Sequence, residues 1–306
     1  MDIHLLVSSI YKNIEDIPVS SQLLFEAANR KGHALHFLPA KQCKMAFGKK
    51  PSVVIPESLP PVQMVLVRKT FATSNSMSYA ALVEQFALAG KPILNGYDSI
   101  MHASNKIRSQ QIMAKHRIPT PLTFVVESAE YVEEVMKKIG KFPVILKQAT
   151  GTHGIGIMIL ESKRGLQSVV DTLVDEERSS GPIIIQQYVR ESAGKDIRVF
   201  VVGNKVVAAM DRIAKKKGEF RSNFSLGGKI KIASLTEEEK KIAIKCAKVF
   251  GLHWTGVDLM RSKSGPQVIE VNSDPGLKGI TQATGVDVAG HIIDYAVKYY
   301  KKLQKK

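Results

Sequence analysis

The stretch KQATGTHGIG, from Lys147 to Gly156, combines a lysine with three glycines and two threonines. Glycine-rich turns of this kind bring backbone N–H groups close to phosphates. The glycine spacing is G-x-x-G-x-G, whereas a dinucleotide-binding turn requires G-x-G-x-x-G and a P-loop requires Gly-Lys followed by Ser or Thr. Both of those motifs open a helix, but here a strand, IGIMIL, is expected. The stretch alone leaves two interpretations open: a flap over phosphates, and an ordinary glycine hairpin with Lys147 in solvent.

A second stretch, TGVDLMRSKSGPQVIEVN from Thr255 to Asn272, has the pattern of a β-hairpin around the turn SKSGP. If the turn centres on Ser264, Asp258 lies opposite Glu270 and Asn272 shares their face. The other, buried face is expected to hold four apolar residues: Val257, Leu259, Ile269 and Val271. Two carboxylates that face each other across a ladder repel. A hard divalent cation such as Mg²⁺ would offset that repulsion; the alternative is an exposed pair with waters and Lys263 nearby.

The composition is that of an ordinary globular protein with a basic surface. Apolar residues make up 44% of 306 residues, and 44 Lys and Arg stand against 28 Asp and Glu, for a net charge of +16. Such a charge favours acidic partners, although a well-solvated basic surface explains it equally. No aromatic-plus-basic pattern predicts base stacking, so sequence-specific nucleic-acid binding is not expected. With no signal peptide, no apolar run of membrane-spanning length and only two cysteines, a cytoplasmic protein without membrane partners is expected.

Three predicted groups of elements position these residues. Up to residue 100, strand-like runs such as IHLLVSS and MVLVRKT alternate with helical patterns, which predicts a parallel sheet covered on both faces. The middle of the chain predicts a small α+β module that contains the glycine-rich loop. After PIIIQQYV strands dominate, and Gly203-Asn204 suits the turn of a hairpin. Thr236 and Glu239 form a capping box at the start of a helix that Gly251 ends, and Trp254 is expected to be a packing residue.

Six segments, in this order, carry a resemblance to a known family. They are NKIRSQQ (105–111), PVILKQATGTHGIGI (143–157), QQYVRESAGKDIRV (186–199), GEFRSNFSLGG (218–228), TGVDLMR (255–261) and VIEVNSDPGLKGI (268–280). Together they resemble the RimK-like α-L-glutamate ligases of the ATP-grasp superfamily over nearly the whole chain. The resemblance implies an α/β fold with an N-terminal doubly wound parallel-sheet domain (1–100), a central α+β lid domain (101–185) and a C-terminal antiparallel-sheet domain with the metal site (186–306).

The same resemblance assigns contacts to ATP. Lys106 and Lys147 would contact its phosphates, and Asp196 would hold the ribose. The backbone at Gln187 and Tyr188 would recognise adenine. The lid loop over the phosphates would be Gly151, Thr152, His153, Gly154, Ile155 and Gly156. Arg221, Ser222 and Asn223 would reach the phosphate and acceptor side.

The resemblance also assigns a metal and a catalytic set. Asp258, Glu270 and Asn272 match the ligands of Mg²⁺ or Mn²⁺, with two ions expected. Arg221, as a planar fork, and Lys147, as a point charge, are the catalytic candidates. The sequence departs from the family at four positions. Asn105 and Gln187 stand where acidic residues are expected, and Asp274 and Lys278 stand where the ribosomal-protein ligases carry a neutral residue and Glu.

The activity that the resemblance implies is ATP-dependent formation of an amide bond through an acyl phosphate. The amine is expected to be glutamate or a similar amino acid, and the acceptor an acidic protein C-terminus, such as that of a ribosomal protein, or a polyglutamate. Two alternatives stay open. One keeps the chemistry but uses an amino-group carrier protein or a pterin or deazaflavin coenzyme. The other is a basic ribosome- or RNA-associated ATP-binding protein. The resemblance further implies a homotetramer.

Overall fold

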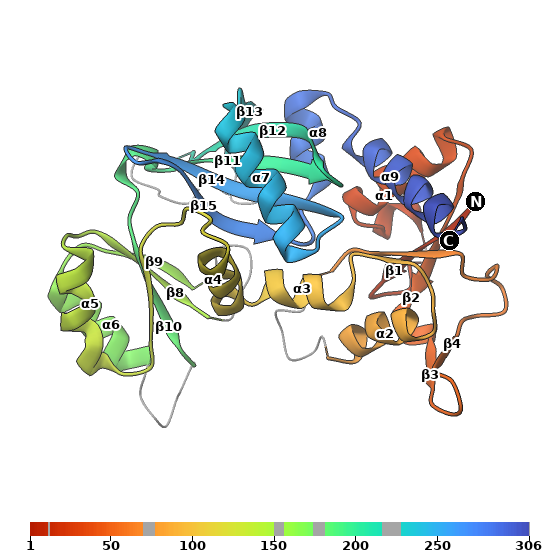
Figure 1. The fold of residues 1–306 in the computed structure, drawn as a ribbon, viewed down its shortest axis with the longest axis horizontal. Helices are drawn as coiled ribbons and strands as arrows, with labels where there is room; N and C mark the ends of the chain where they lie inside the picture. Colours follow the sequence, from red (N-terminus) through yellow and green to blue (C-terminus); the bar gives the residue numbers. More distant parts are fainter. Residues whose placement is uncertain (12, 70–76, 150–155, 174–180, 216–227, 306) are drawn as a thin grey trace.

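The computed structural model describes residues 1–11, 13–69, 77–149, 156–173, 181–215 and 228–305. In these ranges the chain forms three main sheets and a two-stranded ribbon of β3 (Lys44–Ala46) and β4 (Ser52–Val54). Figure 1 shows the three sheets in a row, with the sheet formed last in the chain between the other two. Helices α3 (Tyr97–Ser104) and α4 (Lys106–Lys115) connect the first sheet to the sheet formed by the middle segment of the chain. We call this second sheet the central sheet, after its place in the sequence, although it lies at one end of the row in Figure 1. Among the described helices, none is both long and apolar enough to cross a bilayer.

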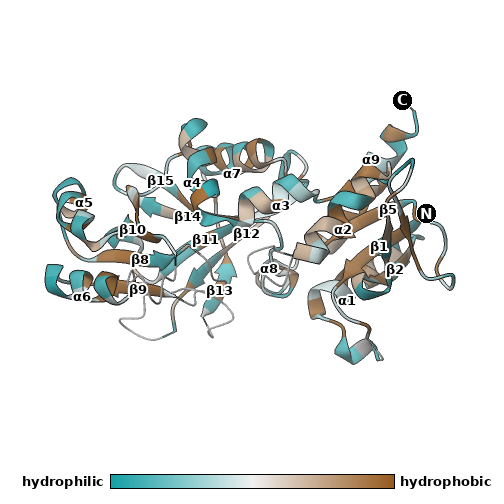
Figure 2. Cartoon of the chain, turned by 90° about the horizontal axis from the view of Figure 1, so that it is seen from below, coloured by the Kyte–Doolittle hydropathy of each residue, from teal (hydrophilic) through white to brown (hydrophobic). Residues whose placement is uncertain are grey.

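The first sheet is parallel, with the strand order β2-β1-β5-β6. Its strands are β1 (Asp2–Val7), β2 (Ala34–Pro39), β5 (Met64–Val67) and β6 (Ile93–Leu94). Every residue of β5 is buried, because helices cover both faces. One face packs on α2 (Met77–Leu88), and the other packs on α1 (Val19–Arg30) and α9 (Val288–Leu303). In Figure 2, β1 and β5 are accordingly among the strongly hydrophobic elements. The doubly wound parallel sheet is confirmed, but one of its covering helices comes from the far end of the chain.

The central segment forms an antiparallel sheet with the order β7-β10-β8-β9. Its strands are β7 (Thr123–Val126), β8 (Val144–Gln148), β9 (Ile157–Leu160) and β10 (Ile183–Gln187). Helices α5 (Val132–Ile139) and α6 (Lys163–Leu173) lie next to each other against this sheet (Figure 1). Both helices carry hydrophobic and hydrophilic residues (Figure 2). Their buried residues, such as Val135 and Leu166, pack on strand residues such as Leu146 and Ile185 in a core of their own.

The third sheet is antiparallel, with the order β13-β12-β11-β14-β15. Its strands are β11 (Lys195–Val202), β12 (Lys205–Ile213), β13 (Lys229–Ile232), β14 (Trp254–Ser262) and β15 (Gly265–Asn272). Helix α7 (Glu237–Phe250) packs on this sheet, and α8 (Leu277–Thr284) follows β15. The capping box of α7 is confirmed, because Thr236 Oγ1 accepts from the N–H of Glu239 at 3.2 Å and Glu239 Oε2 accepts from the N–H of Thr236 at 2.8 Å. The hairpin turn at Gly203 is also confirmed, with a φ of +61°.

The β14–β15 hairpin has the pairing that the sequence predicts at its acidic pair. Asp258 is the ladder partner of Glu270. The turn is nevertheless tighter than expected, because Ser262 already pairs with Gly265. A β-bulge next to Asp258 compensates for the difference, since it adds one residue on β15 and so restores the predicted pair.

The bulge changes which residue of β15 is buried. Leu259 pairs with Val268, and both are fully buried. The expectation that Ile269 belongs to the buried face is therefore wrong, because Ile269 is the extra residue of the bulge and is only partly buried. Val257 and Val271 lie in the core as predicted.

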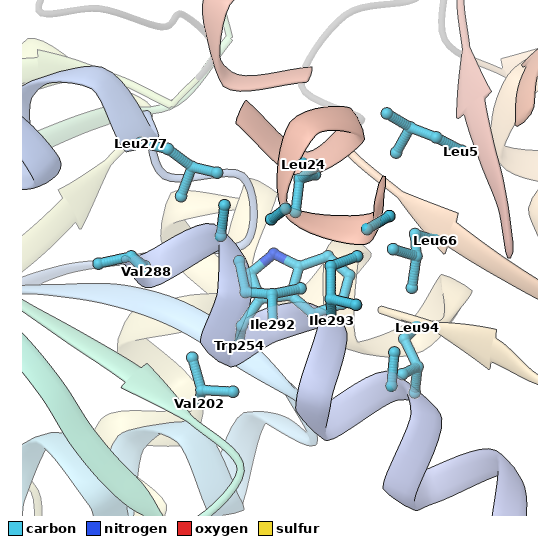
Figure 3. Close-up of a cluster of buried hydrophobic side chains, with 14 of the residues drawn as sticks. Leu5, Leu24, Leu66, Leu94, Val202, Trp254, Leu277, Val288, Ile292 and Ile293 are labelled. Atoms are coloured by element: carbon cyan, nitrogen blue, oxygen red, sulfur yellow. The ribbon is translucent and has the colours of Figure 1, made fainter. Parts of the chain in front are cut away.

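One hydrophobic core joins the first sheet to the third. Trp254 is 2% exposed and lies among apolar side chains from both ends of the chain (Figure 3). The neighbours labelled in Figure 3 are Leu5, Leu24, Leu66 and Leu94 from the first sheet and α1, and Val202, Leu277, Val288, Ile292 and Ile293 from the C-terminal half. The prediction that Trp254 is a packing residue is confirmed.

Candidate active site

The predicted ligand residues that the structure describes lie on elements of the central and third sheets and on α4. Lys106 begins α4, Lys147 is on β8, Gln187 ends β10 with Tyr188 after it, Asp196 is on β11, and Asp258, Glu270 and Asn272 are on β14 and β15. The remaining predicted residues, Gly151, Thr152, His153, Gly154, Ile155, Arg221, Ser222 and Asn223, lie outside the described residues. Only Gly156 represents the glycine-rich loop, and its φ of +76° is one that other residues rarely adopt. A Cβ there would also come within 2.7 Å of Gln148 Oε1.

Asp258 is the centre of a buried network of charges. Its side chain is 5% exposed, and Arg198 donates to both of its oxygens at 2.7 Å. Arg212 donates to Asp258 Oδ2 at 2.7 Å and also holds both oxygens of Asp196, at 2.6 and 2.8 Å. Two guanidiniums therefore face two carboxylates, and their charges balance. Burial opposes the ionisation of Asp258, but the two guanidiniums outweigh it and hold the pKa of this carboxyl below its usual value.

Sequence reasoning missed Arg198 and Arg212. Arg198 faces Asp258 across the β11–β14 ladder, and Arg212 faces Asp196 across the β11–β12 ladder. The turn at Gly203-Asn204 was predicted, but a bulge between Phe200 and Val201 shifts the pairing by one residue. Without that bulge Asp196 would face Asp211. The alternation of Asp196 and Arg198 along one strand was the available clue, since it puts opposite charges on one face.

The acidic pair offers ligands of the type that Mg²⁺ prefers. Three N–H groups occupy the oxygens of Asp258, and a carboxylate has about four acceptor positions, so one is left at Oδ1. Glu270 is exposed, and its side chain forms no hydrogen bond or ion pair with another residue in the described ranges. Asn272 Oδ1 accepts from the N–H of Asp274 at 3.0 Å, which leaves one position on that oxygen. These oxygens fit a hard cation that takes its other ligands from water or phosphate.

The metal set depends on the amide of Asn272. Within the described residues no group of three or more His, Cys, Asp and Glu side chains is arranged to hold a metal ion. The predicted metal set therefore consists of two carboxylates, Asp258 and Glu270, with the amide oxygen of Asn272 as its third protein ligand. The two carboxylates differ in their electrostatic setting. Arg198 and Arg212 offset the negative charge of Asp258, whereas neither arginine bonds to Glu270, so the charge of Glu270 can attract a cation.

Two lysines share the electrostatic environment of Glu270. The ammonium of Lys147 is partly buried and donates to Gln186 Oε1 at 2.8 Å. Burial lowers the pKa of Lys147 to about 8, Glu270 raises it in part, and Lys106 lowers it. Burial likewise lowers the pKa of Lys106, and Glu270 again opposes this. Lys147 is therefore not a solvated lysine beside an ordinary hairpin, and a phosphate bound next to these two lysines would favour their charged ammonium forms.

Two of the departures from the family pattern have distinct structural settings. Asn105 is the N-cap of α4, because its Oδ1 accepts from the N–H of Arg108 at 2.9 Å. Its amide therefore fixes the first turn of the helix on which Lys106 stands. At the end of β10, the backbone N–H of Gln187 donates to Leu122 O at 2.8 Å. Tyr188 follows it and is partly buried, which raises the pKa of its phenol.

Comparison with known proteins gives a consistent result. Residues 103–296 match the model of the RimK-like ATP-grasp domain. The chain is 38% identical over 288 residues, 94% of each chain, to the probable α-L-glutamate ligase 2 of Shewanella sp. (strain MR-4). It is 37% identical over 305 residues to the probable α-L-glutamate ligase 1 of Shewanella frigidimarina (strain NCIMB 400), covering 99% of this chain and 98% of that one.

Solved structures show the same fold at lower identity. The ATP-grasp ligase PsnB, in complex with a phosphomimetic variant of its minimal precursor, Mg and ADP, superposes with a TM-score of 0.72 at 18% identity. The alignment covers 97% of this chain and 98% of that one. The expected ATP-grasp fold, with a parallel first sheet and an antiparallel last one, is thereby confirmed.

Proposed function

The chain belongs to the RimK-like ATP-grasp family and is an ATP-dependent ligase, and we propose that it joins the amino group of L-glutamate to the carboxylate of an acidic acceptor. The names of the curated relatives support glutamate as the amino acid. The net charge of +16 supports an acidic acceptor, such as a protein C-terminus or a polyglutamate chain. That the PsnB ligase was captured with a precursor is in keeping with a peptide acceptor.

The reaction has two steps. An oxygen of the acceptor carboxylate attacks the γ-phosphorus of ATP, the bond to the β,γ-bridging oxygen breaks, and ADP leaves. The amine nitrogen then attacks the carbonyl carbon of the acyl phosphate, the C–O bond to phosphate breaks, and the nitrogen gives up a proton. Neither step needs a nucleophile from the protein. The protein must hold the two substrates in line and offset the charge of the transferred phosphoryl group.

The observation that carries this proposal is that Glu270, the ladder partner of the charge-balanced Asp258, interacts electrostatically with both Lys106 and Lys147. The two partly desolvated lysines would bind the phosphates of ATP as point charges. Mg²⁺ bound by Asp258, Glu270 and Asn272 would neutralise the oxygens of the β- and γ-phosphates. Arg198 and Arg212 keep Asp258 ionised, so this ligand stays ready for a cation. Closure of the loop from Gly151 to Gly156 would keep water from the acyl phosphate.

Mass spectrometry of candidate acceptors tests the proposal. The protein is incubated with ATP, Mg²⁺ and the twenty amino acids, together with an acidic peptide, an amino-group carrier protein or a deazaflavin coenzyme. We expect the mass of one or more glutamyl residues to be added to the acidic peptide. Addition of another amino acid, or addition only to the carrier or the coenzyme, would contradict the proposed substrates. Release of no ADP with any mixture would favour an ATP-binding protein that is not a ligase. Glu270→Gln is the control that links any product to this site.

A further inference from the structure

The segment that directly follows Asn272 is held by the N-terminal part of the chain. Residues 273–277 comprise the connection between β15 and α8 and the first residue of α8. Three elements from the first hundred residues contact this short segment: the end of β6 through Asn95, the end of β5 through Arg68, and α1 through Ser20. The N-terminal part of the chain therefore fixes the position of the segment that directly follows a predicted metal ligand, Asn272.

Asn95 is fully buried and uses both ends of its amide. Its Nδ2 donates to Trp254 O at 3.0 Å and to Ser273 O at 3.3 Å, and its Oδ1 accepts from the N–H of His253 at 2.7 Å. One side chain thus ties the start of β14 to the residue that follows Asn272. At the other end of the segment, Ser20 Oγ accepts from the N–H of Leu277 at 2.9 Å.

Arg68 acts closer to Asn272. Its side chain is 10% exposed, and its Nη2 donates a hydrogen bond to Pro275 O at 3.3 Å. The same Nη2 forms an ion pair with the buried Asp274 Oδ1 at 2.5 Å, a contact that lacks hydrogen-bond geometry. Asp274 is the residue whose backbone N–H donates to Asn272 Oδ1 at 3.0 Å. A continuous set of contacts therefore runs from the guanidinium of Arg68, through Asp274, to the amide oxygen of Asn272.

The loop of residues 273–276 is packed tightly and can adopt few other positions. A Cβ placed on Gly256, the ladder partner of Asn272, would lie 2.8 Å from Pro275 Cβ. The loop thus packs directly on the backbone of β14. Thr255 Oγ1 also donates to Asn272 O at 2.8 Å, which fixes the main chain of the ligand. What remains to be fixed is the rotation of the Asn272 amide, and the N–H of Asp274 does this.

We propose that Arg68 is a positioning residue for cation binding, because it holds Asp274 where its N–H orients the amide oxygen of Asn272. This inference rests on the proposed function, in which Asn272 is a metal ligand. An Asn amide presents either an oxygen acceptor or an NH₂ donor, and only the oxygen binds a cation. The N–H of Asp274 selects the oxygen end and leaves its second acceptor position for the metal. Residues that orient metal ligands in this way typically change affinity about 10- to 100-fold when they are replaced.

The test is a direct measurement of Mn²⁺ binding by electron paramagnetic resonance, with a non-hydrolysable ATP analogue present. Arg68→Met removes the charge and the donor but keeps the length of the side chain. We expect its Kd for Mn²⁺ to rise at least about 10-fold. In activity assays, the Mg²⁺ concentration that gives half-maximal rate should rise likewise, while kcat at saturating Mg²⁺ stays near that of the unmodified protein. Arg68→Lys, which can still reach Asp274, should recover part of the affinity.

Arg30→Met is the matched control. Arg30 also forms an ion pair with an aspartate of the C-terminal part, Asp287, at 2.9 Å, but away from Asn272. This variant should bind Mn²⁺ as the unmodified protein does. Equal Kd values for Arg68→Met and Arg30→Met would overturn the proposal.

A second variant separates this inference from the proposed function. Glu270→Gln should weaken Mn²⁺ binding whatever Arg68 does. If Glu270→Gln binds Mn²⁺ normally, the metal site itself is wrong, and the role of Arg68 is wrong with it. If Glu270→Gln loses Mn²⁺ and Arg68→Met does not, the site stands and only the positioning role is refuted.

Discussion

At the scale of single residues, the two carboxylates of the predicted metal site have different electrostatic roles. Asp258 is buried and balanced by Arg198 and Arg212, whereas Glu270 is exposed. A buried carboxylate of this kind is integral to the fold, because its removal leaves guanidiniums without a counter-charge. Loss of function after a change at Asp258 would therefore not by itself identify a metal ligand, but loss after a change at Glu270 would.

The first prediction compares these two residues. Asp258→Asn should lower the free energy of unfolding by about 3–5 kcal/mol, because it leaves a net positive charge in the buried network. Glu270→Gln should change it by less than about 0.5 kcal/mol, as is usual for an exposed side chain. Both variants should lose Mg²⁺-dependent ATP turnover. Urea unfolding followed by circular dichroism gives the free energies. An Asp258→Asn protein as stable as the unmodified one would show that the network does not depend on charge balance.

The second prediction concerns Lys147 and pH. Its pKa of about 8 lies below the ordinary lysine value of 10.5 because burial removes part of the water around the ammonium. A bound phosphate favours the ammonium and raises this pKa again. Below pH 8 the lysine is already protonated, so binding takes up no proton. Above pH 8 binding requires protonation, and the affinity for ATP should fall by up to about tenfold per pH unit.

Calorimetric titration with ATP, without metal, at pH 7 and pH 9.5 measures this effect. Lys147→Arg keeps the charge at both pH values and should lose most of the difference, with a remainder from Lys106, whose pKa is also lowered. Lys147→Ala should bind weakly at both. An affinity of the unmodified protein that does not change between pH 7 and pH 9.5 would place Lys147 away from the phosphates.

At the scale of secondary-structure elements, local patterns predict well what is decided within a few residues. The capping box at Thr236 and the turn at Gly203 depend on side chains close in sequence, and both are found. The bulges in the β11–β12 and β14–β15 hairpins could not be predicted, because no residue type is unique to them. Both bulges change which side chains meet. The bulge in the β11–β12 hairpin places Arg212 opposite Asp196, and the bulge in the β14–β15 hairpin places Val268 in the core where Ile269 was predicted.

The third prediction concerns the start of α7. Thr236→Ala should cost about 1 kcal/mol of stability, because the N–H of Glu239 loses its acceptor. Glu239→Gln should cost more, about 2 kcal/mol, since its buried carboxylate accepts from the Thr236 N–H and from Arg261 at 2.6 and 2.9 Å. Glu238→Gln removes the same charge from an exposed neighbour and serves as the control. If Glu238→Gln and Glu239→Gln lower the stability equally in thermal unfolding, the hydrogen bonds of Glu239 contribute nothing. The loss would then come only from removing a negative charge near the N-terminus of the helix dipole.

At the scale of the whole molecule, the hydrophobic cores of the described residues do not each correspond to one continuous segment of the sequence. The central sheet has its own core with α5 and α6. The first sheet, in contrast, shares a core with α9, Trp254 and the third sheet. Periodicity predicts that α9 is amphipathic, but it does not predict which sheet its apolar face covers, since that depends on contacts almost 300 residues apart. The boundaries at residues 100 and 185 stay predictions.

The last prediction follows from these cores. Trp254 is the one tryptophan of the chain and lies in the shared core, so its fluorescence reports the unfolding of that core alone. Ile292→Ala in α9 and Leu166→Ala in α6 remove buried side chains of similar size, at about 2–5 kcal/mol each. Ile292→Ala should lower the temperature at which Trp254 fluorescence changes. Leu166→Ala should leave that temperature unchanged and lower an earlier transition in circular dichroism, because the central core unfolds by itself. If both variants shift the Trp254 transition equally, the two cores unfold together, and the central sheet with its glycine-rich loop does not move as an independent lid.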